Sequence, residues 1–380
     1  MALNLIPADT EIAFTRFAPI AQALSALAVL GSIAAFFLLG LNFGIDFRGG
    51  AEIEVGPGPE RAFVTADLDA VRDAVGALDL GDVQVSFISA ATPGGADSIV
   101  VRIEEQPVDP ELVSTGTALP EDVQAENPTA PDADRTLDAE AGAELTGDAC
   151  TMTDAQKRQA IRAGAGAELT QQLTACRVQD ALRATLGADI VERRVDVVGP
   201  TVSGELVQKG VSALVIAVGL MLAYIWLRFE WQFSLGAITA LVHDVILTIG
   251  VFAVTQLDFT LSIIAALLTI IGYSMNDTVV VFDRVRENLR RFKRRALPEV
   301  IDLSINQTLA RTIMTSVTTL LALGSLYFLG GEVLRGFSFA MIWGVVVGTY
   351  SSVFIASPML LRTGVKRDWE KQADPALATP

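Results

Sequence analysis

The sequence has little of what soluble enzymes and nucleic-acid binders are made from. Charged residues make up only 19% of its 380 residues and aromatic residues only 7%, and histidine occurs once. The formal net charge of −16 excludes DNA and RNA as expected ligands, because binding to phosphates rewards basic patches. The single histidine, His243, excludes a histidine-rich metal site.

Familiar catalytic motifs are missing as well. The chain contains neither a Walker-type phosphate loop nor a nucleophile elbow. A Ser-His-Asp triad would have to use His243, which lies in the middle of a long apolar run. The two cysteines, Cys150 and Cys176, do not have the close spacing of metal ligands. We therefore expect no enzyme, no catalytic residues, no metal ion and no bound cofactor.

Apolar residues, in contrast, are abundant and gathered into runs. They make up 51% of the chain, and the mean hydropathy is +0.45. Six runs are long enough to cross a bilayer core of about 30 Å. Each should form a helix, because a lone segment in lipid must satisfy its own backbone hydrogen bonds. The sequence thus predicts an α-helical membrane protein with transmembrane helices at 20–41, 210–227, 233–255, 260–282, 312–330 and 337–361.

The distribution of charge orients these helices. Residues 42–206 contain 30 acidic and 12 basic residues, whereas residues 283–303 contain four acidic and seven basic ones. The positive-inside rule places the short basic loop 283–303 in the cytoplasm. Counting through the helices then puts both termini, 1–19 and 362–380, inside and residues 42–206 outside. The first apolar run is too long for a cleaved signal peptide, so we interpret it as a retained anchor.

The outer region alternates between strand and helix patterns. Alternating or β-rich runs predict strands, and apolar residues spaced along one face predict helices. The order β-α-β-β-α-β is that of a ferredoxin-like α+β domain between helices 1 and 2; a meander with packed helices is the alternative. The expected strands cover 51–55, 83–88, 98–103 and 190–198, and the expected helices 66–78 and 178–186.

One stretch of the outer region departs from this pattern. Residues 104–154 contain 14 acidic residues, one basic residue and no aromatic residue. Such a segment cannot bury enough apolar surface to offset its ordering entropy, so we predict an acidic, disordered insertion. A docking segment for a basic partner is the alternative. Cys150 borders this segment, so a disulfide between Cys150 and Cys176 and two free thiols both remain open.

The ionisable residues inside the apolar runs are the candidate functional residues. Charged groups in lipid are costly and therefore usually functional. Asp244 lies near the middle of the third run, Asn276 and Asp277 lie in the fourth, and Arg311 opens the fifth; we predict that these four residues take part in proton coupling. Arg311 belongs to a polar stripe at helical spacing that can bring it to Asp277 where the two helices meet. The stripe consists of Thr308, Arg311, Thr312, Thr315, Ser316 and Thr319.

A carboxyl group in this setting is suited to exchanging a proton. Burial disfavours its charged form, and a nearby guanidinium favours it. The two opposing effects can leave Asp277 able to take up and release a proton, which suggests a proton-driven machine. For the serines and threonines we favour interhelical hydrogen bonds that fix packing. For Asp244, a role mainly in packing is the alternative to proton coupling.

Five motifs together resemble the SecF family of bacterial protein export, a branch of the resistance-nodulation-division superfamily. SecF is the smaller membrane subunit of the SecD–SecF complex. The motifs are GIDFRGG (44–50), VVGPTVSGEL (197–206), LVHDVILTIG (241–250), IGYSMNDTVVVFDRVREN (271–288) and INQTLARTIMTS (305–316).

The resemblance implies a bacterial inner-membrane subunit that, with SecD, uses the proton motive force to promote preprotein translocation through the SecYEG channel. It implies YajC, YidC and membrane lipid as further neighbours, a periplasmic location for residues 42–206, and no cofactor besides the proton gradient. In the family, the residues corresponding to Asp277 and Arg311 are implicated in proton movement. SecD supplies a further membrane carboxylate that this chain lacks.

Three other functions are weighed against this interpretation. A small-molecule exporter of the same superfamily normally carries two outer domains on twelve helices, whereas this chain has one domain and six helices. An intramembrane aspartyl protease would use Asp244 and Asp277, but Asp277 lacks the expected Gly-x-Gly-Asp context. A membrane scaffold without transport activity would need neither Asp277 nor Arg311.

Overall fold

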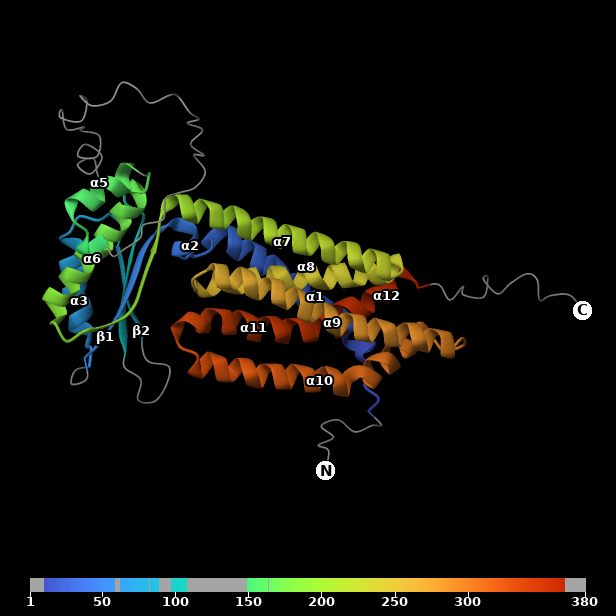
Figure 1. Cartoon of the computed structure of the whole chain (residues 1–380). Coiled ribbons are helices and arrows are strands. Elements are labelled where there is room, and N and C mark those ends of the chain that lie inside the picture. Colours follow the sequence, from blue (N-terminus) through green and yellow to red (C-terminus); the bar gives the residue numbers. More distant parts are fainter. Residues whose placement is uncertain are drawn as a thin grey trace, which may run out of the picture. The chain divides into compact units, whose positions relative to one another are not determined.

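The structure, a computed structural model, describes residues 10–58, 62–81, 83–88, 97–107, 149–162 and 164–365 (Figure 1). The chain divides into two compact units. One comprises Phe43–Lys209, and the other joins Met1–Asn42 to Gly210–Pro380. Most of the predicted acidic insertion, residues 108–148, lies outside the described residues, as do the ends of both expected cytoplasmic termini.

The unit Phe43–Lys209 is built on a four-stranded antiparallel sheet. Its strands are β1 (Gly50–Gly56), β2 (Val83–Ile88), β3 (Ser98–Ile103) and β4 (Val191–Val198), in the order β2-β3-β1-β4. The helices α3 (Thr65–Gly76) and α6 (Gly166–Leu186) pack against each other and the sheet (Figure 1). Chain order and strand order are those of the ferredoxin-like arrangement, so the meander alternative is wrong.

Alternation along the strands separates an apolar face from a charged one. On β1, Ile53 is fully buried among side chains of α3 and α6, including Val71 and Val178. The intervening Glu52 and Glu54 lie on the opposite face, because successive strand residues point to opposite sides. There Glu52 accepts from Arg102 at 2.8 Å, and Glu54 lies 3.7 Å from Arg193.

The second half of this unit is more helical than the sequence pattern predicts. The short helices η2 (Ala149–Thr151) and α5 (Asp154–Arg162) occupy the end of the stretch predicted to be disordered. Helix α6 begins at Gly166 rather than at residue 178. Its first turns contain Thr170, Gln171 and Thr174, which are buried polar residues and therefore hide the apolar periodicity.

A glycine pair makes the entry into β1. After the single-turn helix α2 (Ile45–Arg48), Gly49 and Gly50 have φ angles of +73° and +111°. L-residues rarely adopt such angles. A Cβ atom on Gly50 would also collide with the carbonyl oxygen of Ile103 on the neighbouring strand. Gly50 therefore allows the chain to turn directly into the central strand of the sheet.

The other unit is a helix bundle. Among the described residues, six helices are long and apolar enough to cross a membrane, one for each predicted run. Figure 1 shows them running alongside one another. They are α1 (Phe14–Leu39), α7 (Pro200–Arg228), α8 (Trp231–Thr255), α9 (Leu261–Arg291), α10 (Leu297–Leu329), and α11 (Glu332–Ser351) continued by the π-helical turn η3 (Ser352–Ala356) and α12 (Ser357–Thr363).

The basic segment 283–303 is mostly helical, which corrects its assignment as a loop. Helix α9 continues to Arg291, and α10 already begins at Leu297. Hydropathy marks where a helix leaves lipid, whereas a polar amphipathic stretch can continue the same helix into water. Helix α1 likewise begins at Phe14, before the predicted start at residue 20. The backbone N–H and hydroxyl of Thr15 both donate to Asp302 of α10.

The helices differ in how deeply the bundle buries them. More than half of the apolar stretch is buried in α8 and in the α11–α12 segment, and half in α9. Only 6% is buried in α1 and in α7, and 17% in α10. Helices α8, α9 and α11 therefore form the interior of the bundle. Most of α1, α7 and α10 faces outward, where lipid or another protein can cover it.

Two contacts hold the ends of the segment that interrupts the sheet unit. Cys150 forms a disulfide with Cys176 of α6, with 5.6 Å between the Cα atoms. On the other side of the segment, the Gln171 side chain of α6 donates to the carbonyl of Gln106 at 2.8 Å. Both ends are thus held on the same helix.

Removing the disulfide should weaken the sheet unit without unfolding the bundle. Closing the 26-residue separation reduces the entropy of the unfolded chain, so Cys176→Ala should lower the free energy of unfolding by about 3 kcal/mol. Chemical denaturation of the purified full chain measures this change. Thiol labelling in intact cells is the control, and labelling of both native cysteines would contradict the bond.

Candidate functional site

The interior of the bundle contains two carboxylates. Asp244 of α8 is 2% exposed and Asp277 of α9 is 9% exposed. Both lie within helices expected to cross the membrane. A carboxylate at this depth is unfavourable unless neighbouring groups replace the hydrogen bonds of water. The side chains that surround the two aspartates therefore define the site.

Two hydroxyl groups hold Asp277. Thr312 of α10 donates to Oδ1 at 2.5 Å, and Ser352 at the start of η3 donates to Oδ2 at 2.5 Å. Both donors are neutral, so the carboxylate is solvated without being neutralised. The same two bonds tie α9 to α10 and to η3.

A second network surrounds Asp244. Its Oδ2 accepts from Ser274 of α9 at 2.5 Å and from Ser351 of α11 at 2.7 Å. Its Oδ1 lies 2.8 Å from Nδ1 of His243. The other ring nitrogen, Nε2, is buried without a hydrogen-bond partner among the described residues. His243 lines a cavity of about 270 Å³ together with Gln22, Ser25 and Arg362, which leaves room for water near that nitrogen.

Two consecutive serines connect the networks. Ser351 donates to Asp244, and Ser352 donates to Asp277. Neighbouring helical side chains are about 100° apart, so the pair can reach α8 on one side and α9 on the other. Each serine also has a second acceptor on its own helix: the carbonyl of Gly348 lies 3.1 Å from Ser351, and that of Thr349 lies 3.0 Å from Ser352.

These serines can therefore act as two-position donors. A hydroxyl carries one hydrogen and can donate to only one acceptor at a time. Ser352 can point that hydrogen at the Asp277 carboxylate or at the Thr349 carbonyl. The π-helical turn begins at this residue, and single π-helical turns are frequent at functional sites. The geometry provides a rearrangement that needs no movement of the backbone.

Within the described ranges, Arg311 lies next to Thr312 on α10 but does not contact the carboxylate of Asp277. Its side chain is exposed, and no ion pair within 4 Å joins it to Asp277 in the part of the chain that the structure describes. The adjacent Thr312 occupies the position that faces Asp277, and Arg311 lies about 100° further around α10. Its charge still acts on the Asp277 carboxylate through space.

The other predicted residues divide between the network and the surface. Asn276 is exposed and takes no part in the bonds around the aspartates. Ser316 of the predicted polar stripe bonds to Thr349 at 2.7 Å and accepts from Tyr273 at 3.2 Å, which links α10 to α11 and α9. No cluster of three or more His, Cys, Asp or Glu side chains suited to a metal occurs in the described ranges.

Sequence reasoning missed the serines that solvate the aspartates. Ser274, Ser351 and Ser352 lie within apolar runs, and serines in membrane helices commonly bond to their own backbone. The presence of a serine therefore does not indicate whether its hydroxyl bonds to its own helix or to a neighbouring helix. The one available signal is the consecutive pair at 351–352, which must present hydroxyls to two different neighbours.

Comparison with known proteins places these features in a family. The C-terminal model of the protein export membrane proteins SecD/SecF matches residues 177–366, and the SecD/SecF GG motif matches residues 34–58. The second match contains the Gly49–Gly50 turn described above.

Relatives and solved structures agree. The chain is 40% identical to the protein translocase subunit SecF of Cereibacter sphaeroides, covering 97% of this chain and 95% of that protein. It is 36% identical to the protein translocase subunit SecDF of Brucella abortus, covering 96% of this chain and 39% of the longer one.

The crystal structure of SecDF from Thermus thermophilus, described as a translocon-associated membrane protein, superposes with a TM-score of 0.67 at 27% identity. The match covers 94% of this chain and 39% of that one. The six membrane helices and the interposed sheet unit are thus those of a shared architecture, and the chain belongs to the SecF family of protein-export membrane proteins.

Proposed function

We propose that this protein-export subunit uses a transmembrane proton gradient to promote preprotein translocation, and that Asp277 is the group that takes up and releases the proton. The observation that supports this is the solvation of Asp277 by two neutral hydroxyls, with no ion pair to it within the ranges that the structure describes. A carboxyl held in this way remains available for protonation. A purely structural bond would not need a formal charge in lipid.

Protonation would reorganise the hydrogen bonds around Asp277. An ionised carboxylate only accepts, whereas the protonated acid also donates one hydrogen. One of the two hydroxyls must then turn from donor to acceptor. Ser352 is the one with a ready alternative, because the Thr349 carbonyl lies 3.0 Å from its oxygen. The change reaches η3 directly and reaches α10 through Thr312.

Arg311 completes the proposed cycle. We propose that Arg311 pairs with ionised Asp277 in one state and is released when Asp277 is protonated. Helices α1 and α7 continue along the chain into α2 and out of β4, so a shift in the bundle has a direct covalent route to the sheet unit.

The proposed assembly includes a SecD partner. Two similar proteins carry the name SecDF, and this chain corresponds to 39% of each. The outward faces of α7 and α10, with the exposed Arg311, are surfaces on which such a partner can pack. A membrane carboxylate supplied by SecD would compensate Arg311. We propose SecYEG as the channel served, with YajC and YidC as further neighbours.

The proposed setting is the bacterial inner membrane, with both termini in the cytoplasm and residues 42–206 in the periplasm. Support comes from the basic residues at the end of α9 and in the turn that leads to α10, because such clusters stay on the cytoplasmic side. A disulfide in the sheet unit fits an oxidising compartment.

Reporter fusions test this orientation. A fusion after Ala130 should report the periplasm, and a fusion after Ala296, in the turn between α9 and α10, should report the cytoplasm. An alkaline phosphatase reporter and a cytoplasm-active fluorescent reporter at the same two sites control for expression. The reverse pattern would contradict the orientation and, with it, the proposed direction of export.

Asp277→Asn tests the titrating group. Asparagine keeps the shape of the side chain and, like the protonated acid, offers both an acceptor oxygen and a donor, but it cannot bind the transported proton. Arg311→Lys keeps the charge but loses the planar fork that fits a carboxylate. Both variants should insert and assemble normally, yet lose most of the stimulation of export by a proton gradient. Translocation into vesicles, with and without a gradient, measures this.

The same assay separates coupling from scaffolding. If the Asp277→Asn variant supports export at the wild-type rate across a full proton gradient, the titrating role is wrong and a scaffold function is favoured. Asp244→Asn is the companion variant. A smaller loss than that of Asp277→Asn is expected if Asp244 acts mainly in packing.

Ser352→Ala tests the proposed two-position donor. The variant removes one of the two hydroxyls on Asp277 and should cost stability by about 1 kcal/mol, as interhelical hydrogen bonds do in membranes. We expect gradient-dependent export to fall by a larger fraction than the amount of folded protein does. Ser338→Ala is the matched control, because Ser338 is also buried in α11 but makes no hydrogen bond within the described residues. Equal effects of both variants would count against the donor role.

A further inference from the structure

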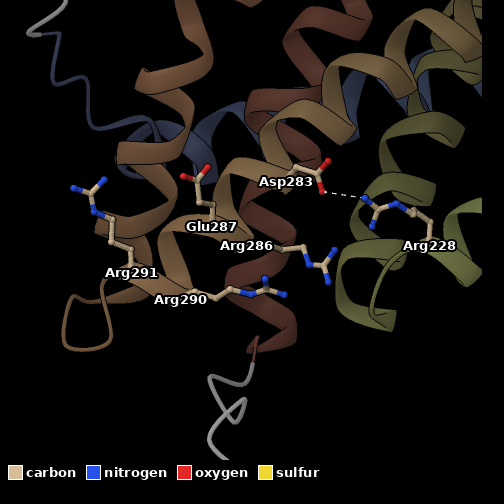
Figure 2. A pocket seen from close by; sticks show the side chains of 6 residues that line it. All are labelled: Arg228, Asp283, Arg286, Glu287, Arg290 and Arg291. Atoms are coloured by element: carbon tan, nitrogen blue, oxygen red, sulfur yellow. Dashed lines mark ion pairs between the residues drawn. The ribbon is translucent and has the colours of Figure 1, made fainter. Parts of the chain in front are cut away.

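A pocket with a strongly basic lining lies at one end of the bundle. It has a volume of about 560 Å³ and lies between the last turn of α7 and the polar extension of α9. Figure 2 shows the six residues that line it. These are Arg228, Asp283, Arg286, Glu287, Arg290 and Arg291.

Three of the arginines approach the same space. Arg228 enters from α7, and Figure 2 shows Arg286 and Arg290 extending from α9 toward that side. Arg291 points the other way. The pocket thus brings guanidinium groups from two helices together, although like charges repel one another unless an anion lies between them.

The acidic residues of the pocket do not balance this charge. Asp283 lies 3.8 Å from Arg228, in a half-exposed ion pair. Glu287 already accepts from Arg284, which lies outside the pocket lining, at 2.8 Å. The lining therefore contains four arginines and two carboxylates, and one of these carboxylates also pairs with an arginine outside the lining.

Arg286 supplies a second, independent indication of a ligand. Its Nε atom is buried and has no hydrogen-bond partner among the described residues. A buried donor of a charged group without an acceptor is unfavourable, and such groups usually have one. The guanidinium of Arg286 lies over the Phe229 ring, 5.9 Å from its centroid, and a turn of the side chain toward the pocket would bring Nε to an anion seated there.

The surroundings place this pocket at the level of lipid head groups. Tyr224, Trp226 and Trp231 are each more than half exposed and flank Arg228 along the chain. Exposed tyrosine and tryptophan side chains mark the boundary between membrane and water. The adjacent Leu227 is 86% exposed, and Leu220 and Ile216 continue an open apolar surface along α7.

We propose that this pocket binds an anionic phospholipid. Its phosphodiester would lie among Arg228, Arg286 and Arg290, because the arginine fork binds two phosphate oxygens at once. Its acyl chains would lie along the exposed apolar face of α7. Basic pockets between membrane helices on the cytoplasmic side are suited to such head groups. The proposal does not depend on proton coupling.

Native mass spectrometry of the purified, delipidated full chain tests the site. The probe is phosphatidylglycerol, with phosphatidylcholine as the neutral comparison. The first phosphatidylglycerol should bind at least about fivefold more tightly, the factor expected from one arginine at a lipid surface. Arg286→Gln should weaken that binding by about fivefold, and Arg286→Gln with Arg290→Gln should weaken it further.

Arg294→Gln is the matched control. It removes the same charge from the exposed turn after α9, outside the pocket lining, and should leave the affinity unchanged. An equal loss in Arg294→Gln and Arg286→Gln would overturn the proposal in favour of diffuse surface charge. Equal affinity for both lipids would also overturn it.

Inorganic phosphate alone distinguishes the source of the anion. If phosphate binds and displaces phosphatidylglycerol completely, the pocket is a site for a soluble anion and the lipid assignment is wrong. If phosphatidylglycerol remains bound in excess phosphate, the acyl chains contribute as proposed. Thermal unfolding of each variant in detergent verifies that the bundle is intact.

Discussion

The helices of the bundle pack around two buried carboxylates, those of Asp244 and Asp277. These carboxylates receive hydrogen bonds from protein hydroxyls in place of water. Among the described residues, every hydroxyl that bonds the carboxylate of Asp244 or Asp277 comes from another helix, so the aspartates fix how α8, α9, α10 and the α11–η3 segment pack. This requires close approach. A Cβ atom on Gly348 would lie 2.9 Å from the side chain of Ser274, so glycine at this position lets α11 come near enough to α9. The same hydrogen bonds therefore determine both how the inner helices pack and what surrounds the two carboxylates.

The same constraint explains the contrast between the inner and outer helices. Helices α8, α9 and α11 are held on several sides by polar bonds, whereas α7 and most of α10 present apolar side chains outward. Arg311 lies on the exposed face of α10, although the neighbouring Thr312 lies on the face that bonds to Asp277. One turn of α10 thus carries both a part of the enclosed network and an exposed charge that makes no ion pair with Asp277 among the described residues.

The general architecture could be predicted because it depends on patterns averaged over many residues. Long apolar runs mark the six helices, alternation over 51–55 and 83–88 marks two strands of the sheet, and the β-rich run 98–103 marks the strand between them. The partners of Asp277 could not be predicted in the same way, because they depend on the rotation of each helix. A rotation of 100° exchanges Arg311 for Thr312, and the sequence contains both. Helix ends beyond the lipid boundary, as at Arg291, also escape hydropathy, which measures the solvent around a residue rather than its backbone conformation.

The two anchors on α6 have a consequence for how this protein can change. Gln106 is held by Gln171 and Cys150 by Cys176, and these two positions on α6 lie about 8 Å apart along its axis. Gln106 and Cys150 are therefore held at the same positions on α6, whatever chain connects residue 107 to residue 149. That junction is a natural graft site: a foreign domain whose own ends lie close together can be spliced there, giving the export machinery an added module without redesign of its fold.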